Sequence, residues 1–120
     1  MAKIIIVEDD ALILDDLKNS LSRAGHTIIG SFAKGENALI DIEKEKPDLV
    51  LMDIKLEGYI DGIETAAIIK FKYNIPIIYL TAFSNEKFVE RSKQTEPIAY
   101  LLKPFSEEEL IKAVDKALNK

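Results

Sequence analysis

The chain has 120 residues, 48% of them hydrophobic and 31% charged, a composition that suits one folded domain and excludes a disordered chain. Its 16 basic and 21 acidic residues leave a net charge of −5, which argues against direct binding to nucleic-acid phosphates. It contains no cysteine, which fits the cytoplasm. Its first apolar run spans only residues 4–7, which is too short for a signal peptide or a membrane span. We therefore expect a cytoplasmic domain without a membrane partner.

Short apolar runs recur along the chain, and each has the length of a β-strand. Their nearly continuous apolar character is typical of parallel strands that are buried on both faces. The segments between them are about 10–15 residues long, which is the spacing of βαβ units. The predicted strands are residues 3–7, 27–32, 48–53, 75–81 and 98–102.

The segments between the predicted strands repeat apolar residues at helical spacing. Leu14, Leu17 and Leu21 form such a stripe, and Gly25 is suited to end that helix in the left-handed conformation. The predicted helices are residues 10–24, residues 36–46, a helix that opens at Asp61, residues 84–95 and a helix that opens at Ser106.

Two of these helices begin with a capping box, in which a side-chain oxygen accepts a hydrogen bond from the third residue and that residue's carboxylate points back. Asp61 and Glu64 form this pattern in the third helix, and Ser106 and Glu109 form it in the fifth. The capping boxes therefore predict where the third and fifth helices begin, which the apolar stripes alone do not.

The fourth helix has only Phe88 and Val89 as sizeable apolar residues. A helix that buries so little is held weakly, so we expect it to be the most mobile helix. Strands and helices alternate along the whole chain, which predicts an α/β fold with a doubly wound parallel sheet, and we interpret residues 1–120 as one domain.

Polar side chains follow four of the five predicted strands. The carboxyl ends of parallel strands meet at one edge of a sheet, where ligands of such sheets bind. Clustered carboxylates repel each other, and a hard cation such as Mg²⁺ relieves that repulsion. Each residue also has an ordinary structural explanation, and Asp10 is explained equally well as a helix N-cap. The side chains are Glu8, Asp9, Asp10, Asp53, Thr81 and Lys103.

Four segments together resemble the signature of the response-regulator receiver domain, the CheY-like fold of two-component signalling. They are residues 4–10 (IIIVEDD), 47–54 (PDLVLMDI), 80–82 (LTA) and 100–105 (YLLKPF). The resemblance covers the whole chain, with the motifs in order. It implies a five-stranded parallel sheet in the flavodoxin-like order 2-1-3-4-5 with five helices.

The resemblance also implies a function. Asp53 would accept a phosphoryl group from a sensor histidine kinase or a histidine phosphotransfer protein. Glu8 and Asp9 would hold Mg²⁺ together with Asp53 and the main-chain carbonyl of Lys55. Phosphorylation would make the domain a signalling switch and no enzyme in the usual sense, since it would catalyse only its own phosphorylation and dephosphorylation.

The other residues of the motifs receive roles from the same resemblance. Lys103 would pair with the phosphoryl group, and Thr81 and the amide of Ala82 would donate hydrogen bonds to it. Tyr100 would turn inward when Thr81 moves, and the bond between Lys103 and Pro104 would be cis. A downstream protein would bind the face formed by the fourth helix, the fifth strand and the fifth helix.

Two features depart from the family pattern. Residues 55–60 form a loop one residue longer than usual and without proline, and residues 96–99 read Glu-Pro-Ile-Ala where Gly-Ala is common. The resemblance also places Lys55 and Phe83 at the positions that, in the family, flank the approach of water to the phosphoryl group. Neither side chain can accept a hydrogen bond from water, so we expect slow self-dephosphorylation.

Other functions fit the sequence less well or differ only in setting. The chain could be a receiver segment of a larger hybrid sensor kinase or multidomain regulator, an alternative that the sequence leaves open. An Mg²⁺-dependent aspartyl phosphatase would place its nucleophile after the first strand in an Asp-x-Asp pattern, which is absent here. A flavin-binding module would need a phosphate loop where the carboxylates stand, and a pseudo-receiver would lack some of the motif residues.

Overall fold

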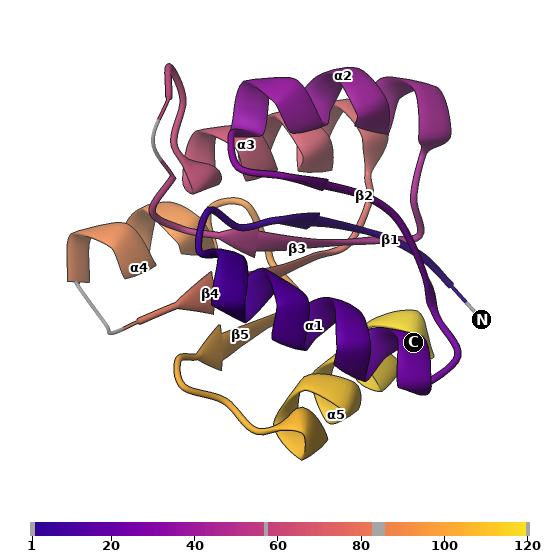
Figure 1. Cartoon of the computed structure of the whole chain (residues 1–120). Coiled ribbons are helices and arrows are strands. Elements are labelled where there is room, and N and C mark those ends of the chain that lie inside the picture. The colour runs from indigo at the N-terminus through magenta and orange to yellow at the C-terminus, as the bar shows by residue number, and fades with distance from the viewer. Residues whose placement is uncertain (1, 57, 83–85, 120) are drawn as a thin grey trace.

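A computed structural model of the chain describes residues 2–56, 58–82 and 86–119. In these residues, five parallel strands form one sheet in the order β2-β1-β3-β4-β5 (Figure 1). The strands are β1 (Lys3–Val7), β2 (Thr27–Phe32), β3 (Leu49–Asp53), β4 (Ile77–Thr81) and β5 (Ala99–Leu102). The helices are α1 (Ala11–Arg23), α2 (Gly35–Glu45), α3 (Gly62–Ile68) with its continuation η1 (Ile69–Tyr73), α4 (Glu86–Lys93) and α5 (Glu107–Leu118). The expected doubly wound α/β fold, including its strand order, is confirmed.

Helices cover both faces of the sheet (Figure 1). On one face, α1 and α5 bury Leu17, Leu21 and Val114 against the strands. On the other face, α2, α3 and α4 pack around a second core that contains Tyr79, the largest fully buried side chain among the described residues. Because both faces are covered, the strands consist of nearly continuous apolar residues, as the sequence indicates.

The predicted strands are correct at their carboxyl ends and begin one or two residues too early for β3, β4 and β5. Before β4, Pro76 has no amide hydrogen to donate, so the strand begins at Ile77. Before β3, the carboxylate of Asp48 accepts a hydrogen bond from the amide of Lys3 at 2.8 Å. The functional residues follow the carboxyl ends, so these differences leave the site unchanged.

Both predicted capping boxes are confirmed. The carboxylate of Asp61 accepts a hydrogen bond from the amide of Glu64 at 2.8 Å, and Glu64 accepts one from the amide of Asp61 at 2.9 Å. Ser106 and Glu109 exchange the same pair of bonds at 3.0 and 2.9 Å. Each cap satisfies amides that have no partner inside the helix, and so it fixes where α3 and α5 begin.

The third helix continues as a π-helix, which the sequence pattern does not predict. The wider turn η1 buries Ile69 against the core. It ends at Asn74, whose left-handed backbone (φ 56°) directs its amide to the carbonyls of Ile69 and Lys70, both at 3.0 Å. A hydrophobic stripe with a period of 3.6 residues fits either type of turn over so short a distance, so the pattern cannot distinguish them.

The fourth helix is shorter than predicted, because α4 ends at Lys93 rather than at residue 95. The predicted start at residue 84 and Phe83 lie outside the described residues. Phe88 and Val89 are half-buried, and the fully buried side chains near the end of this segment are the polar Ser92 and Thr95. Among the described helices, none combines the length and the apolar content needed to cross a bilayer.

Gly62 provides a test of how closely α3 packs against the sheet. A Cβ atom at this position would lie 1.9 Å from the carbonyl oxygen of Asp53, which belongs to the backbone and cannot move aside cheaply. We expect Gly62→Ala to lower the free energy of unfolding by at least about 2 kcal/mol. Urea denaturation measures this, with Lys112→Ala on the exposed face of α5 as a control that should change little. Equal stability of the two variants would contradict this packing.

Candidate functional site

Three carboxylates meet at the carboxyl edge of the sheet. Glu8 and Asp9 follow β1, and Asp53 ends β3. One carboxylate oxygen from each residue lies within 4.8 Å of the other two. Glu8 and Asp53 are buried, with 2% and 6% of their surface exposed, whereas Asp9 is exposed. These three carboxylates are among the side chains that the sequence predicts at this edge, and the order of the strands explains why they meet.

Asp10 stands outside this cluster and has the structural role that the sequence offered as an alternative. Its carboxylate accepts hydrogen bonds from the amides of Leu12 at 2.9 Å and Ile13 at 3.3 Å, so it is the N-cap of α1. Its own amide donates to the carboxylate of Glu8 at 3.1 Å. Asp10 thus starts α1 and helps to orient Glu8.

Lys103 brings a positive charge to the buried carboxylates. Its Nζ atom lies 2.8 Å from Oε1 of Glu8 and 3.5 Å from Oδ2 of Asp53. The residue follows β5, and its amide donates to the carbonyl of Thr81 at 2.6 Å. The bond between Lys103 and Pro104 is cis, as the family resemblance implies. Strands β1, β3 and β5 therefore each supply one charged group to the same point.

Burial and repulsion make the charge of Asp53 costly. Burial, and then the nearby carboxylate of Glu8, raise the pKa of Asp53 to about 7, against the opposing effect of Lys103. Burial alone would lower the pKa of Lys103, but its hydrogen bond to Glu8 and the charges of both carboxylates outweigh burial and raise it. Lys103 therefore stays charged at neutral pH while Asp53 titrates near neutrality.

Asp53 opens into a small cavity of about 140 Å³. The amide of Lys55 donates a hydrogen bond to Oδ1 of Asp53 at 3.1 Å, which orients the carboxylate. The ammonium of Lys55 lies 5.5 Å from the centre of the Phe88 ring. The cavity is lined by Asp53, Ile54, Lys55, Thr81, Ala82, Phe88 and Lys103. Sequence reasoning gave each of these residues a role at the site except Ile54 and Phe88, and it described Phe88 only as one of two sizeable apolar residues in the weak fourth helix.

Tyr100 is linked to α4 through a hydroxyl group. Its ring stacks on Tyr79 of β4 with 5.6 Å between ring centres, and 39% of its surface is exposed. Its hydroxyl lies 2.6 Å from Oγ of Ser92, which itself donates to the carbonyl of Val89 at 2.8 Å. Since Ser92 uses its hydrogen there, Tyr100 is the donor to Ser92.

The buried Tyr79 makes the same kind of link one turn further along. Its hydroxyl lies 2.6 Å from Oγ1 of Thr95, and Thr95 donates to the carbonyl of Ser92 at 2.6 Å. Burial raises the pKa of Tyr79 to about 12, so this phenol keeps its proton. Tyr79, Thr95, Ser92 and Tyr100 form what we call the hydroxyl chain, which ties the end of α4 to β4 and β5.

The loop that departs from the family pattern is held by Glu36 at the start of α2. The amide of Tyr59 donates to Oε2 of Glu36 at 3.2 Å, and Gly58 adopts a left-handed backbone (φ 124°). Hydrogen bonds from the amides of Glu36 itself and Tyr59 lower the pKa of Glu36. A Cβ at Gly58 would lie 2.8 Å from the Glu36 carboxylate, so glycine permits this contact. Sequence reasoning did not assign a role to Glu36.

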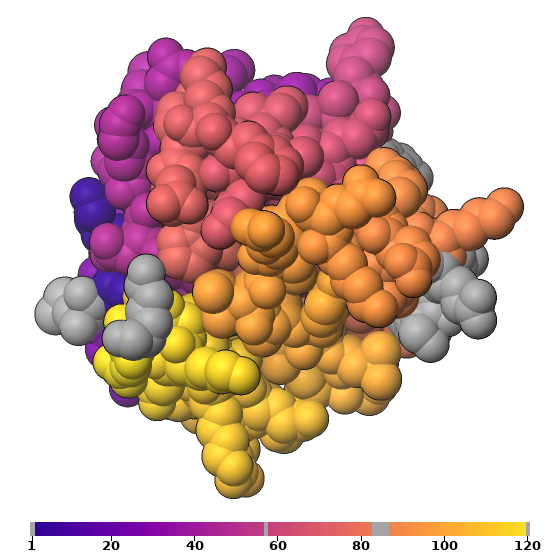
Figure 2. Space-filling view, turned by 180° about the vertical axis from the view of Figure 1, so that it is seen from behind, coloured from indigo at the N-terminus to yellow at the C-terminus, as the bar shows by residue number. Residues whose placement is uncertain are grey.

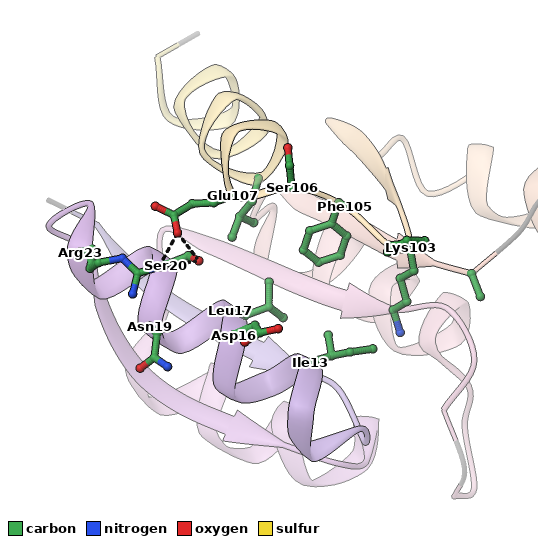
Figure 3. A pocket seen from close by; sticks show the side chains of 13 residues that line it. Ile13, Asp16, Leu17, Asn19, Ser20, Arg23, Lys103, Phe105, Ser106 and Glu107 are labelled. Carbon is green, nitrogen blue, oxygen red and sulfur yellow. Dashed lines mark hydrogen bonds and ion pairs between the residues drawn. The ribbon is translucent and has the colours of Figure 1, made fainter.

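A second cavity of about 640 Å³ lies between α1 and the segment from Lys103 to α5 (Figure 3). Ser20 and Arg23 of α1 both bind the carboxylate of Glu107, and these bonds lower the pKa of Glu107, Arg23 having the larger effect. Leu17 and Phe105 contribute apolar walls. Sequence reasoning missed this cavity, because its polar residues are more than 80 positions apart in the chain.

The sequence-family model of the response regulator receiver domain matches residues 4–115 of the chain. The chain belongs to the response regulator receiver family. This receiver is 42% identical over 118 residues to the transcriptional regulatory protein PdtaR of Mycobacterium tuberculosis. The aligned region covers 98% of the chain and 57% of PdtaR. It is 36% identical over 118 residues to the sensory transduction protein LytT of Bacillus anthracis, covering 97% of the chain and 47% of that protein.

A solved structure agrees with this assignment. The signal receiver domain of a modulated diguanylate cyclase from Desulfovibrio desulfuricans G20 is 34% identical to this receiver, with a TM-score of 0.95 over 99% of this chain and 94% of that one. The chain spans about half the length of the curated relatives it matches, 57% of PdtaR and 47% of LytT. A transcriptional regulatory protein, a sensory transduction protein and a diguanylate cyclase thus each contain a region similar to this receiver.

The raised pKa of Asp53 predicts how stability depends on pH. The ordinary pKa of 3.8 applies to the unfolded chain and a value of about 7 to the folded one, so the folded protein binds more protons between these values. Stability therefore falls as pH rises through this window. We expect Asp53→Asn to raise the free energy of unfolding by roughly 1–3 kcal/mol at pH 8 and by little at pH 4, without divalent metal.

Urea denaturation in the presence of a chelator at both pH values measures this difference. The matched control is Asp115→Asn, which makes the same chemical change at an exposed position on α5 and should give no pH-dependent gain. A gain for Asp53→Asn of equal size at pH 4 and pH 8 would contradict the electrostatic explanation.

Proposed function

We propose that this receiver is a signalling switch whose Asp53 accepts a phosphoryl group from a phosphohistidine of a sensor histidine kinase or a histidine phosphotransfer protein. The arrangement around Asp53 carries the proposal. A buried carboxylate opens into a cavity that is large enough for a small anion and whose lining includes Lys103 and Thr81. Membership of the receiver family supports the same reaction class.

The proposed chemistry assigns a task to each side chain. An oxygen of Asp53 would attack phosphorus, forming an acyl phosphate while the bond from phosphorus to the histidine nitrogen breaks. Lys103, 3.5 Å from Asp53, would neutralise a phosphoryl oxygen. Thr81 and Ala82 line the cavity, and the hydroxyl of Thr81 and the amide of Ala82 would donate hydrogen bonds to the other oxygens. Such transfer depends on positioning and charge neutralisation more than on covalent catalysis by the protein.

We also propose that the carboxylate cluster holds Mg²⁺. The donor set fits a hard cation, because three carboxylates offer oxygens within 4.8 Å of one another and two of these groups are buried. Glu8, Asp9 and Asp53 would hold the ion, together with the carbonyl of Lys55. The bound ion would supply positive charge against the incoming phosphoryl group, and it would favour the ionised Asp53 that attack requires.

The proposed output surface comprises α4, β5 and α5, which lie side by side in Figure 2 as the orange and yellow regions. The exposed apolar side chains here include Leu102, with 58% of its surface accessible, and Tyr100. The hydroxyl of Tyr100 is bonded to Ser92, so an inward turn of Tyr100 would break the link between β5 and α4. A downstream protein that binds this surface could therefore sense the state of Asp53.

The setting of the receiver in its native chain is a separate question. The relatives that it matches are about twice as long, which supports the alternative that the domain functions within a larger regulator. Phosphorylation of Asp53 would serve a stand-alone receiver and a receiver segment in the same way. We propose no enzymatic activity beyond phosphorylation and dephosphorylation of the domain itself.

The direct test is incubation with acetyl phosphate and Mg²⁺, followed by intact mass measurement. We expect wild type to gain the mass of one phosphoryl group and Asp53→Asn to gain none, because its amide is not nucleophilic. Lys103→Ala and Asp9→Asn should be phosphorylated more slowly by about tenfold or more, since each removes one charged partner of the site. Asp115→Asn is the control and should match wild type. Modification of Asp53→Asn to the wild-type extent would refute the assignment.

A further inference from the structure

One aromatic side chain of α4 reaches the cavity over Asp53. Among the described residues of α4, Phe88 alone lines that cavity. Its ring is half-buried and packs against the core beneath α2 and α3. The neighbouring Val89 is buried to a similar degree and does not line the cavity. Burial alone therefore does not explain why Phe88 lies at the cavity, because Val89 is similarly buried without reaching it.

Phe88 also contacts a charged residue from a different element. The ammonium of Lys55, in the loop after β3, lies 5.5 Å from the centre of the Phe88 ring, within the range of a cation–π interaction. The same residue donates its amide to Oδ1 of Asp53 at 3.1 Å. Lys55 thus touches Asp53 with its main chain and Phe88 with its side chain, so its stem extends along the cavity between them.

We propose that Phe88 is a positioning residue that holds the side chain of Lys55 across the mouth of the cavity and thereby limits the access of water to phosphorylated Asp53. This inference rests on the proposed function. In the step concerned, a water oxygen bonds to phosphorus and the bond from phosphorus to the Asp53 oxygen breaks. The products are the Asp53 carboxylate and inorganic phosphate, and the proton of the water passes to phosphate or solvent.

The proposal makes the lifetime of the phosphorylated state depend on the position of α4. Two polar links of α4 lie nearer its carboxyl end, where Arg91 is 3.0 Å from Asp61 and Ser92 is hydrogen-bonded to Tyr100. Phe88 is about one turn closer to the amino end and lines the cavity directly. A displacement of α4 would therefore carry the ring away from Lys55 and open the cavity to water.

The test compares the decay of the acyl phosphate in five variants after the phosphodonor is removed, with Mg²⁺ present and intact mass as the readout. Phe88→Leu removes the ring and keeps an apolar side chain, and Lys55→Met removes the charge and keeps the stem. Both should decay about two- to fivefold faster than wild type, the range that a partly exposed cation–π contact supports. The double variant should decay no faster than the faster single variant, because each change removes the same contact.

Two further variants separate positioning from loosening of the helix. Phe88→Tyr keeps an aromatic face and should restore the wild-type lifetime. Val89→Ala weakens the packing of α4 without touching the cavity, and it should also decay at the wild-type rate. Faster decay of Val89→Ala than of Phe88→Leu, or a double variant whose acceleration is the product of the single ones, would overturn the proposal.

A spectroscopic readout tests the contact without phosphorylation. In wild type and Phe88→Tyr, the ring current should shift the ε-methylene proton signals of Lys55 upfield, and Phe88→Leu should abolish this shift. Absence of the shift in wild type would refute the contact even if Asp53 is phosphorylated normally. Absence of phosphorylation with the shift present would instead refute the proposed function and, with it, the claim about lifetime.

Discussion

The structure depends on an unequal charge balance, in which the buried carboxylates of Glu8 and Asp53 face the single ammonium of Lys103. Lys103 lies closer to Glu8, at 2.8 Å, than to Asp53, at 3.5 Å. Burial, and then the negative charge of Glu8, raise the pKa of Asp53 to about 7, because Lys103 compensates these effects only in part. Breaking a buried ion pair leaves an uncompensated charge, which costs several kcal/mol in typical proteins. The protein thus holds Asp53 in surroundings that oppose its ionisation.

This balance exists because of the strand order. β1 lies between β2 and β3, and β4 lies between β3 and β5, so residues from the beginning, middle and end of the chain meet at one edge. Gly62 allows α3 to approach the backbone of Asp53. Glu36 accepts a hydrogen bond from the amide of Tyr59, in the loop that joins β3 to α3. The stability of the fold and the chemistry of the site therefore share the same contacts.

The parts of the fold that sequence could predict are those determined locally. Apolar runs predict buried parallel strands, and capping boxes such as Asp61 with Glu64 predict where helices begin. The carboxylate cluster follows from these elements, because Asp53 ends one strand and Glu8 follows another. For these features, residues near each other in the chain carry the necessary information.

The features that sequence could not predict depend on pairs of distant residues. Polar residues such as Ser92 and Thr95, near the end of a weak helix, would ordinarily be placed on its solvent side. Both are buried, because their hydroxyl groups are hydrogen-bonded to those of Tyr100 and Tyr79. Phe88 belongs to the cavity because Lys55 lies opposite it. The local pattern contains no sign of these pairings, which arise only when α4 packs on the sheet.

These distant contacts connect α4 both to the proposed phosphorylation site and to β5, its neighbour in the proposed output surface. Phe88 contacts Lys55, Arg91 pairs with Asp61, and Ser92 bonds Tyr100. Each contact is worth little alone, since partly exposed ion pairs and hydroxyl bonds contribute about 1 kcal/mol. A helix held by several weak contacts can change position when one charge is added nearby, which is the property a switch requires.

The central claim is that burial and the charge of Glu8 raise the pKa of Asp53, and that a bound cation would lower it again. The most direct measurement is the titration of the Asp53 carboxyl carbon by ¹³C NMR, with and without Mg²⁺. We predict an apparent pKa near 7 without metal, and a decrease of at least about one unit when Mg²⁺ is present, because the cation favours the ionised form. An ordinary acidic pKa that does not change with Mg²⁺ would contradict the account.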